Sequence, residues 1–302
     1  FRVAGEGAAS LLVEEGAEVE VAGSAYVYSM NDGPASSVAV TGENSLFDVS
    51  GLLDVGGEGT GELTVSDGGS VRSGSARVGR QSPKTGIVTI TGAGSEWLVD
   101  GSPFVLGGDA DGIPGTGHLT LADGGLLQLD GGTGTLHAAL GDGSTARINI
   151  GAAEGEEAAA AGTLDLGTIA FDTDGGGDGR LLFNHTATDY LFGALLEGAG
   201  TVSHIAGVTT FTGLSTAFTG VTSITGGQLN VDGTLGGSMS VSNARLGGSG
   251  TVGGTALNGG GVLSPGNSIG TLTVDGDLAF GGGSFFEVEL NDGGTVAGTN
   301  ND

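Results

Sequence analysis

Apolar and polar residues alternate along most of this chain, in short stretches separated by glycine-rich turns. In GELTVS (61–66) the apolar residues Leu63 and Val65 fall on one face of an extended strand and the polar residues on the other, because successive side chains of a strand point to opposite sides. GHLTLA (117–122) repeats the arrangement. The Asp-Gly-Gly run at 67–69 supplies residue types that accept the positive φ angles of a sharp bend. The pattern predicts strands with one buried face, joined by tight corners.

The strand pattern also recurs at regular spacing. GTGELTVSDGGSV (59–71) returns as GTGHLTLADGGLL (115–127), and the triplets VTG, VSD and ITG begin at residues 40, 65 and 90. The offset between other copies lengthens along the chain, which is the effect of loop insertions on a constant scaffold. We therefore predict an all-β solenoid in which one step of about 25 residues is one coil. Its function is expected to reside in its shape.

Four stretches are expected within one continuous, elongated solenoid. They are N-terminal strand-like coils at 1–34, Gly-rich repeat coils at 35–151, irregular coils with loop excursions at 152–225, and regular C-terminal coils at 226–302. In the last stretch GQLNVDG (227–233) matches GTLTVDG (270–276), and the offset is interpreted as two coils of about 21 residues.

Insertions at 108–115, 151–162 and 172–179 are expected to project as loops. The second of these, GAAEGEEAAAAG, interrupts the strand pattern and is the one place where a short helix or a flexible excursion competes. These loops are the parts of the chain that could contact host surfaces, glycans or sister cells.

The composition favours a folded, exported protein and excludes several partners. Glycine accounts for 67 of 302 residues, yet 37% of the residues are hydrophobic and they are evenly spread, unlike those of a disordered chain. The net charge is −27 with Lys84 as the single lysine, which argues against nucleic acid and anionic membrane surfaces. Cysteine is absent, and a solenoid does not need disulfides because each coil buries its apolar row on the next. No apolar run approaches the roughly twenty residues of a membrane helix.

Residues 226–290, which contain LSPGNSIGTLTVDGDL, resemble the repeat near the end of autotransporter passenger domains, the secreted parts of Gram-negative type V secretion proteins. The phrases GTGxLTVxDGG and TGxGSxWxVxG within 35–151 resemble a Gly-rich repeat of the same exported proteins. The resemblance implies a right-handed parallel β-helix at the cell surface or secreted, anchored at the outer membrane. It also implies a C-terminal outer-membrane β-barrel translocator as a partner, which is expected outside this chain. Passengers of this family include adhesins, proteases, esterases and toxins, so the resemblance does not name an activity.

Two motifs match enzyme patterns without the context that the chemistry needs. Gly266-Asn-Ser268-Ile-Gly270 satisfies GxSxG, but a nucleophile elbow needs a helix after the serine and a strand-like segment follows here. Residues 248–253 satisfy GxGxxG, but a dinucleotide site needs a helix N-terminus that the glycines after it disfavour. We interpret both as corners of coils and expect no catalytic residue and no cofactor.

No metal site is expected either. The four histidines lie far apart without zinc-protease spacing and are interpreted as solvated or rim residues: His118, His137, His185 and His204. The acidic runs at 172–178 and 109–112 invite a calcium hypothesis, but an EF-hand frame over the first puts Phe183 where the bidentate glutamate belongs. Both runs are interpreted as acidic glycine turns.

Four of the eight basic residues lie within thirteen positions, at Arg72, Arg77, Arg80 and Lys84. They are interpreted as solvated charges, with a local anion or glycan contact as the alternative. Thr64, Thr89 and Thr120 occupy equivalent repeat positions and could form a ladder on one sheet face, which favours strand pairing and could contact a polysaccharide or ice.

Three functions remain open at this point. The first is a stiff β-helical stalk that presents loops for adhesion to surface molecules or glycans, with its ligand-binding residues unknown. The second is a polysaccharide-active or hydrolytic enzyme on the same fold, for which Arg72, Arg77 and Arg80 beside Asp67 offer the only region with both charges. The third is a pure spacer for an N-terminal effector domain outside this chain.

Overall fold

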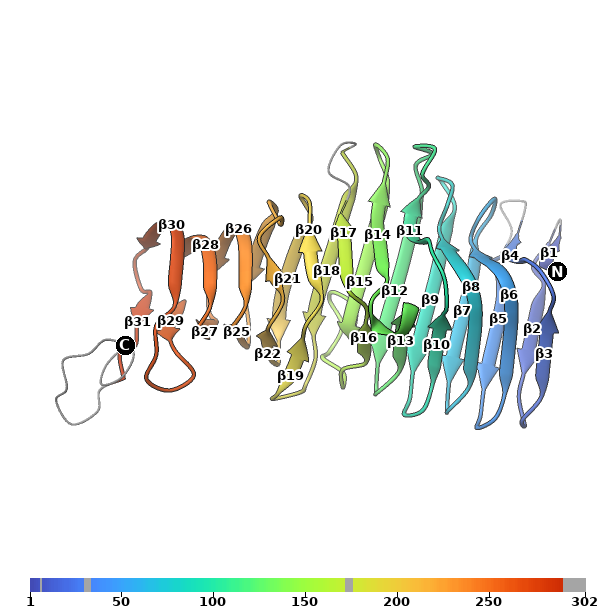
Figure 1. Cartoon of the computed structure of the whole chain (residues 1–302), viewed down its shortest axis with the longest axis horizontal. Helices are drawn as coiled ribbons and strands as arrows, with labels where there is room; N and C mark the ends of the chain where they lie inside the picture. The colour runs from blue at the N-terminus through green and yellow to red at the C-terminus, as the bar shows by residue number, and fades with distance from the viewer. Residues whose placement is uncertain (6, 30–33, 172–175, 290–302) are drawn as a thin grey trace. The chain divides into compact units, whose positions relative to one another are not determined.

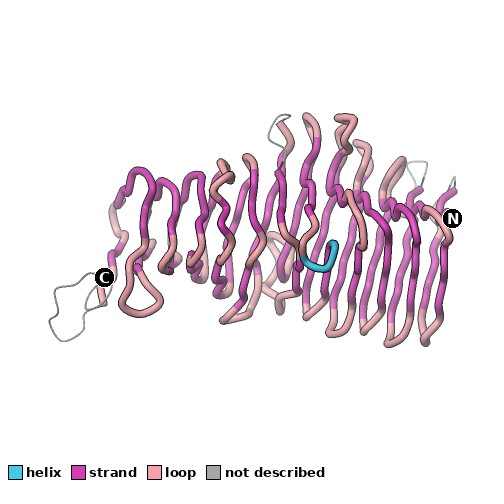
Figure 2. The backbone as a smooth tube through the Cα atoms, viewed as in Figure 1, coloured by secondary structure: helices cyan, strands magenta, loops and turns pink. Residues whose placement is uncertain are grey.

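The computed structural model describes residues 1–5, 7–29, 34–171 and 176–289. Strands account for nearly all of the regular structure, and within the described residues the one helical element is η1 (Asp130–Gly132). Figure 2 shows this single short turn among the strands. The chain divides into two compact units, which we call unit 1 (Phe1–Arg180) and unit 2 (Leu181–Asp302). The prediction of an all-β parallel β-helix is confirmed.

Unit 1 consists of parallel strands stacked into two sheets (Figure 1). The strands of sheet 1 are β1 (Arg2–Gly5), β3 (Glu18–Val21), β4 (Ala25–Ser29), β6 (Leu46–Val55), β8 (Ser70–Val78), β10 (Glu96–Val99), β11 (Phe104–Gly108), β13 (Leu126–Leu129), β14 (Thr135–Leu140), β16 (Thr163–Asp165) and β17 (Thr168–Phe171). The strands of sheet 2 are β2 (Ser10–Val13), β5 (Ser36–Thr41), β7 (Gly61–Ser66), β9 (Thr85–Thr91), β12 (Thr116–Ala122) and β15 (Thr145–Gly151). One coil takes strands from both sheets in turn.

The core of unit 1 is built from columns of apolar side chains that repeat from coil to coil. One column in sheet 2 runs through Val40, Val65, Ile90, Leu121 and Ile150, which are paired in register and fully buried. The first three members confirm the predicted coil length. Burying each such side chain contributes roughly 1.5–3 kcal/mol, so stacked coils stabilise one another.

The corners of the coils require glycine or a left-handed aspartate. Asp67 and Asp123 have φ angles of 53° and 51°, as the Asp-Gly turns predicted. Gly56 has φ +77°, and a Cβ at this position would lie 2.4 Å from Cα of Gly86 in the next coil. Adjacent coils therefore touch backbone to backbone at this corner, where any side chain would separate them.

The single tryptophan, Trp97, is fully buried in unit 1. Its indole Nε1 donates a hydrogen bond of 3.0 Å to Ser73 Oγ, and its ring packs on Phe104 with 5.4 Å between centroids. This satisfied polar contact removes the cost of burying the indole N–H.

Residues 151–162 form no helix, so the alternative of a short helix there was wrong. The segment returns to the corner after β12, where Asp123 N donates to Ala160 O at 2.8 Å and Gly162 N donates to Leu121 O at 3.1 Å. Glu154 also pairs with Arg180. The backbone groups that would otherwise drive helix formation are satisfied by the neighbouring corner.

Unit 2 is a second stack of parallel strands. Its sheet 3 contains β21 (Thr201–Ala206), β23 (Leu214–Ser215), β24 (Val221–Ile224), β26 (Thr234–Val241), β28 (Thr251–Leu257) and β30 (Thr273–Phe280). Its sheet 4 contains β19 (Tyr190–Phe192), β22 (Val208–Phe211), β25 (Gln228–Val231), β27 (Arg245–Gly248), β29 (Val262–Pro265) and β31 (Phe285–Phe286). The strand β20 (Leu195–Glu197) also belongs to this unit, and β18 (Asp178–Asn184) spans the boundary between the units.

Coils in unit 2 are shorter than the sequence suggested. Gln228 pairs with Arg245, and Arg245 pairs with Val262, so each coil here is shorter than the one predicted for this stretch. The match between 227–233 and 270–276 is therefore not a two-coil repeat. Its two copies lie in different sheets, β25 and β30, because any apolar alternation before an Asp-Gly turn produces the same letters. The four-stretch division of the chain stays a prediction.

Candidate functional site

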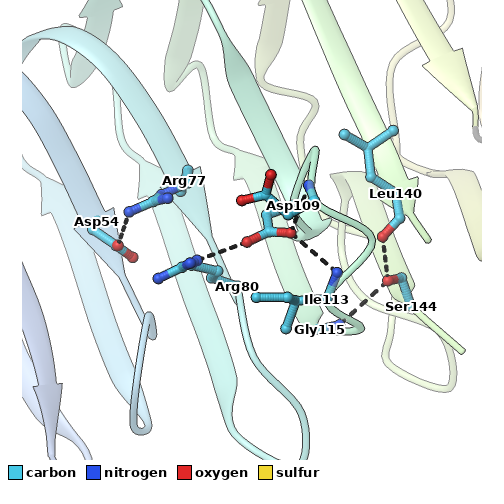
Figure 3. A network of polar contacts seen from close by, with 9 residues as sticks. Asp54, Arg77, Arg80, Asp109, Ile113, Gly115, Leu140 and Ser144 are labelled. Atoms are coloured by element: carbon cyan, nitrogen blue, oxygen red, sulfur yellow. Dashed lines mark hydrogen bonds and ion pairs between the residues drawn. The ribbon is translucent and has the colours of Figure 1, made fainter. Parts of the chain in front are cut away.

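A network of charged side chains lies on the outward face of sheet 1 (Figure 3). Asp54 and Arg77 are paired in register on β6 and β8. Asp54 alternates with the core residues Leu53 and Val55, yet it is only 2% exposed. Its carboxylate is covered in part by Gly57, where a Cβ would lie 2.6 Å from Asp54 Oδ1. This network is the most buried cluster of opposite charges that we find among the described residues.

The Asp54–Arg77 ion pair joins two successive coils. Arg77 Nη2 donates to Asp54 Oδ2 at 2.7 Å, while Asp54 Oδ1 and Arg77 Nε have no hydrogen-bond partner within the described chain. Burial raises the pKa of Asp54, and the guanidinium of Arg77 opposes that rise. A buried carboxylate of this kind depends on its partner, because removing the arginine would leave an uncompensated charge.

A second pair, Arg80 with Asp109, shapes the loop at 109–114. Arg80 Nε donates to Asp109 Oδ2 at 2.8 Å, and Asp109 Oδ1 accepts hydrogen bonds of 3.0 Å from the backbone N–H groups of Asp111 and Ile113. Although burial raises the pKa of Asp109, the hydrogen bonds from Arg80 and the loop backbone outweigh it and lower the pKa. One carboxylate thus fastens the loop to the coil below it.

The next corner continues the network with neutral groups. Ser144 Oγ donates to Leu140 O at 2.5 Å and accepts from Gly115 N at 3.3 Å. The end of the 109–114 loop is therefore tied to the following coil as well. The insertion is held at both ends, which limits the conformations it can adopt.

The described residues contain no group of three or more His, Cys, Asp or Glu that could hold a metal ion. Both carboxylate oxygens of Asp109 accept hydrogen bonds, from Arg80 and from the backbone of its own loop, so this residue of the hypothesised calcium site at 109–112 is already engaged. The other calcium hypothesis rests on residues 172–175, which lie outside the described residues.

Interpreting Arg77 and Arg80 as solvated charges was wrong, because each holds a carboxylate that is at most 5% exposed. The structure does not bring Asp67 into this network, since its carboxylate accepts a 3.2 Å hydrogen bond from Thr41 at a different corner. Arg72 is exposed, as expected for a solvated charge. The sequence analysis missed Asp54, although its spacing from Arg77, close to one coil, was a usable signal.

Two histidines meet in the core of unit 2, so interpreting them as solvated or rim residues was wrong. His185 and His204 are fully buried and both contact the hydroxyl of Thr209, at 2.8 Å and 3.2 Å from their Nε2 atoms. His204 Nδ1 lies 2.9 Å from the carbonyl oxygen of Gly226 and must donate to it. Burial lowers the pKa of both imidazoles, that of His204 to about 4. Their separation along the chain is close to one local coil, which is the signal that could have found them.

The remaining histidines lie in unit 1, on outward faces. His118 is half-buried on β12, and burial, with a smaller effect of Arg147, lowers its pKa. His137 lies on β14 opposite Val105. Neither histidine is paired with a nucleophile by any hydrogen bond within the described chain.

The motif serine lacks the helix that a nucleophile elbow requires. Ser268 lies in the loop between β29 and β30, where a strand and not a helix follows. The polar pocket that it lines contains no histidine. The glycines at 248–253 likewise lead into strand β28, so the dinucleotide pattern has no helix N-terminus.

The threonine column on the outward face of sheet 2 is confirmed. Thr64, Thr89 and Thr120 are cross-strand partners on β7, β9 and β12. Asn149 extends the column, with Nδ2 donating to Thr120 Oγ1 at 3.0 Å. The result is a flat polar face on four successive coils.

Comparison with known proteins gives two relatives of similar sequence. The chain is 34% identical over 273 residues to the adhesin BmaC autotransporter of Brucella suis, which covers 73% of this chain and 8% of that protein. This chain is homologous to an autotransporter adhesin. It is also 32% identical over 252 residues to the uncharacterized lipoprotein YdeK of Escherichia coli, covering 80% of this chain and 17% of that protein. The resemblance to autotransporter passengers is thereby confirmed, and the chain spans less than a fifth of either relative.

No protein-family model matches the chain, and no solved structure matches it. Within the described residues, none of the helical structure is long or apolar enough to cross a membrane. The names of the two homologues point to the cell surface or outer membrane as the location, and neither name is that of an enzyme.

Proposed function

We propose that this chain is a passenger segment of a surface adhesin, in which stacked coils hold loops outward for contact with molecules or glycans on another cell. The homology to an autotransporter adhesin is the observation that carries the proposal. A C-terminal translocator, outside this chain, would deliver it to the surface and keep it at the outer membrane of a Gram-negative bacterium.

The geometry of unit 1 supports this function through the loop at 109–114. Its carboxylate anchor, Asp109, is 4% exposed, whereas Ala110, Asp111 and Gly112 at the tip are exposed. A preorganised loop loses less conformational freedom on contact with a partner than a flexible one. The anchored insertion is therefore suited to contact with a partner and is not a flexible linker between coils.

The test is adhesion by bacteria that display residues 1–302 through a heterologous translocator. We expect them to adhere to epithelial monolayers more than bacteria that display the translocator alone. Replacing 110–113 with Gly-Ser residues, which keeps Asp109 and the coils, should reduce adhesion severalfold. The same replacement at the exposed corner 14–17, which lies outside the three insertions, serves as the matched control.

Equal adhesion with and without the displayed chain would refute the adhesin function. Adhesion that is unchanged by the 110–113 replacement, or reduced as much by the control replacement, would refute the role given to this loop. Surface display of each variant is measured with an antibody, so that loss of export is not mistaken for loss of contact.

A further inference from the structure

A polar pocket of about 360 Å³ opens on the outward face of sheet 4 in unit 2. The side chains around this pocket, which we call the recess, are amides, hydroxyls, one guanidinium and one carboxylate. They come from β25, β27, β29, the loop that follows β29 and the segment that follows β31. The lining residues are Gln228, Asn230, Arg245, Ser264, Gly266, Asn267, Ser268 and Glu289. Its size is at the lower end of the range for small-molecule sites.

Gly247 leaves no room for a side chain in the middle of an outward column. Asn230, Gly247 and Ser264 are successive partners on β25, β27 and β29. A Cβ at Gly247 would lie 2.8 Å from Asn230 Oδ1 and 3.0 Å from the carbonyl oxygen of Ser264. The Asn230 amide therefore lies over the Gly247 backbone, beside the pocket that Asn230 and Ser264 line.

Internal contacts hold the walls of this recess in place. Gln228 Nε2 donates to Asn230 Oδ1 at 2.8 Å, which orients both amides. On the other side, Asn267 Nδ2 donates to both carboxylate oxygens of Asp232, at 2.8 Å and 2.9 Å. Asp232 Oδ1 also accepts from Ser249 N at 3.0 Å, so the loop carrying Ser268 is tied to the neighbouring turns.

Several polar groups of the pocket keep unused hydrogen-bonding capacity within the described chain. The contact between Gln228 and Asn230 leaves Gln228 Oε1 as an acceptor and Asn230 Nδ2 as a donor. The hydroxyls of Ser264 and Ser268 can each donate and accept. A recess with donors and acceptors side by side matches vicinal sugar hydroxyls, which also donate and accept.

The charges around the pocket select against an anionic ligand. Arg245 is already paired with Glu287, and Glu289 adds a second carboxylate to the rim. The whole chain carries a net charge of −27, which repels anions. A neutral ligand needs no free guanidinium and is not repelled by the negative charge of the chain.

An exposed aromatic ring lies on the same face. Phe285 is 59% exposed and continues the column of Gln228, Arg245 and Val262 through register pairing. Aromatic faces carry partial negative charge and attract the C–H groups of a sugar ring. A chain of sugars that runs across the coils would meet first the recess and then this ring.

We propose that this face of unit 2 binds a neutral glycan chain, with one sugar unit in the recess beside Asn230 and Ser264 and a neighbouring unit against Phe285. This inference rests on the proposed adhesin function, to which it adds a site and a class of glycan, and it is testable on the purified chain without cells. Failure of the cell-adhesion assay therefore does not count against it.

The test is titration of the purified full chain with maltotetraose, cellotetraose, xylotetraose and chitotetraose, and with trigalacturonate as the anionic comparison. We expect at least one neutral tetrasaccharide to bind with a dissociation constant of about 1 mM or tighter, measured by calorimetry and saturation-transfer NMR. Trigalacturonate should bind more weakly than that neutral sugar.

Variants locate the site. Asn230→Ala and Gln228→Ala should each weaken binding about tenfold, and Phe285→Ala should weaken the tetrasaccharide more than the corresponding disaccharide. The matched control is Thr210→Ala, in the same outward column one coil before Asn230 and outside the pocket lining. Far-ultraviolet circular dichroism checks that each variant is folded. If one of the two amide variants fails to fold, the other still tests the site.

Three outcomes would overturn the proposal. The first is that no neutral tetrasaccharide binds at about 10 mM, roughly ten times the expected dissociation constant. The second is that both amide variants bind as well as the parent chain. The third is that trigalacturonate binds more tightly than every neutral sugar.

Discussion

The buried histidine pair makes unit 2 sensitive to acid, and His204 provides the sharpest test. Its pKa is about 4 in the folded chain against an ordinary 6.5, because burial disfavours the imidazolium. Burial is the largest cause of the lowered pKa, the hydrogen bond to the Gly226 carbonyl opposes it, His185 adds to it, and no carboxylate is among the causes. At about 1.4 kcal/mol per pH unit, the difference between 6.5 and about 4 amounts to about 3 kcal/mol of folding stability.

The sign follows from which state binds the proton. The unfolded chain takes up a proton on His204 near pH 6.5 and the folded chain only near pH 4, so acid favours unfolding over this interval. The stability is fully present above pH 6.5 and is lost as the pH falls toward 4. Lowering of the His185 pKa by burial adds a loss in the same direction.

The assay is urea unfolding at pH 7.5, 6.5, 5.5 and 4.5, compared between the parent chain and His204→Asn. The asparagine amide can replace Nδ1 as the donor to Gly226 O but carries no titrating group. We expect the variant to be less stable at pH 7.5 because it loses the contact with Thr209, and to lose less stability than the parent on acidification. Far-ultraviolet circular dichroism gives the overall transition, and fluorescence of Trp97 reports on unit 1.

The comparison between variants removes the effect of the many carboxylates, which titrate in both chains. His137→Asn, on the outward face of β14 in unit 1, is the matched control and should follow the parent at every pH. Parallel loss of stability in the parent and in His204→Asn between pH 6.5 and 4.5 would contradict the reasoning.

Three further predictions concern unit 1. Asp54→Asn should destabilise the chain by about 2 kcal/mol, because it leaves the Arg77 guanidinium without its carboxylate partner. The double variant with Arg77→Met should regain part of that stability, since it removes the unpaired charge and the arginine is already 24% exposed. The urea midpoints of the parent, both single variants and the double variant measure the coupling. Gly56→Ala should abolish cooperative thermal unfolding or soluble expression, whereas Gly112→Ala, with a similar positive φ and open space around it, should cost only about 1–2 kcal/mol; equal effects would contradict the backbone contact. Asp109→Ala should make its loop a site of early cleavage by proteinase K, which has broad specificity, while the circular dichroism spectrum is unchanged. Unaltered digestion would show that the anchor is dispensable.

The alternating apolar pattern was sufficient to predict the architecture of unit 1. Val40, Val65 and Ile90 recur at the coil length and lie in register, so the sequence period and the structural period coincide. The Thr64 and Thr89 ladder follows from the same register. Patterns of this kind are visible because each coil buries the same positions against its neighbour.

Contacts between coils could not be predicted where the coil length changes. The local coil shortens to the step that pairs Val208 with Gln228, and only this shorter step makes His185 and His204 neighbours. After Gln228 the step shortens again. For this reason the match between 227–233 and 270–276 gave a wrong coil length, because the two matching segments lie in strands of different sheets.

The charged network escaped prediction for a different reason. Arg77 was misjudged because the exposure of an outward side chain depends on which loop lies over that face of the sheet. Asp54 beside it carries no sequence signature, since an acidic residue at an outward strand position is ordinarily solvated. Its burial follows from the turn at Gly57, which packs against the carboxylate.

The change in coil length has a mechanical consequence. Coils in the first part of unit 1, such as the step from Val40 to Val65, contain more residues than coils in unit 2, such as the step from Gln228 to Arg245. A coil with more residues has a longer perimeter, and the resistance of a stack of coils to bending rises with its width. With each unit taken by itself, unit 2 should therefore bend under a smaller lateral load than unit 1.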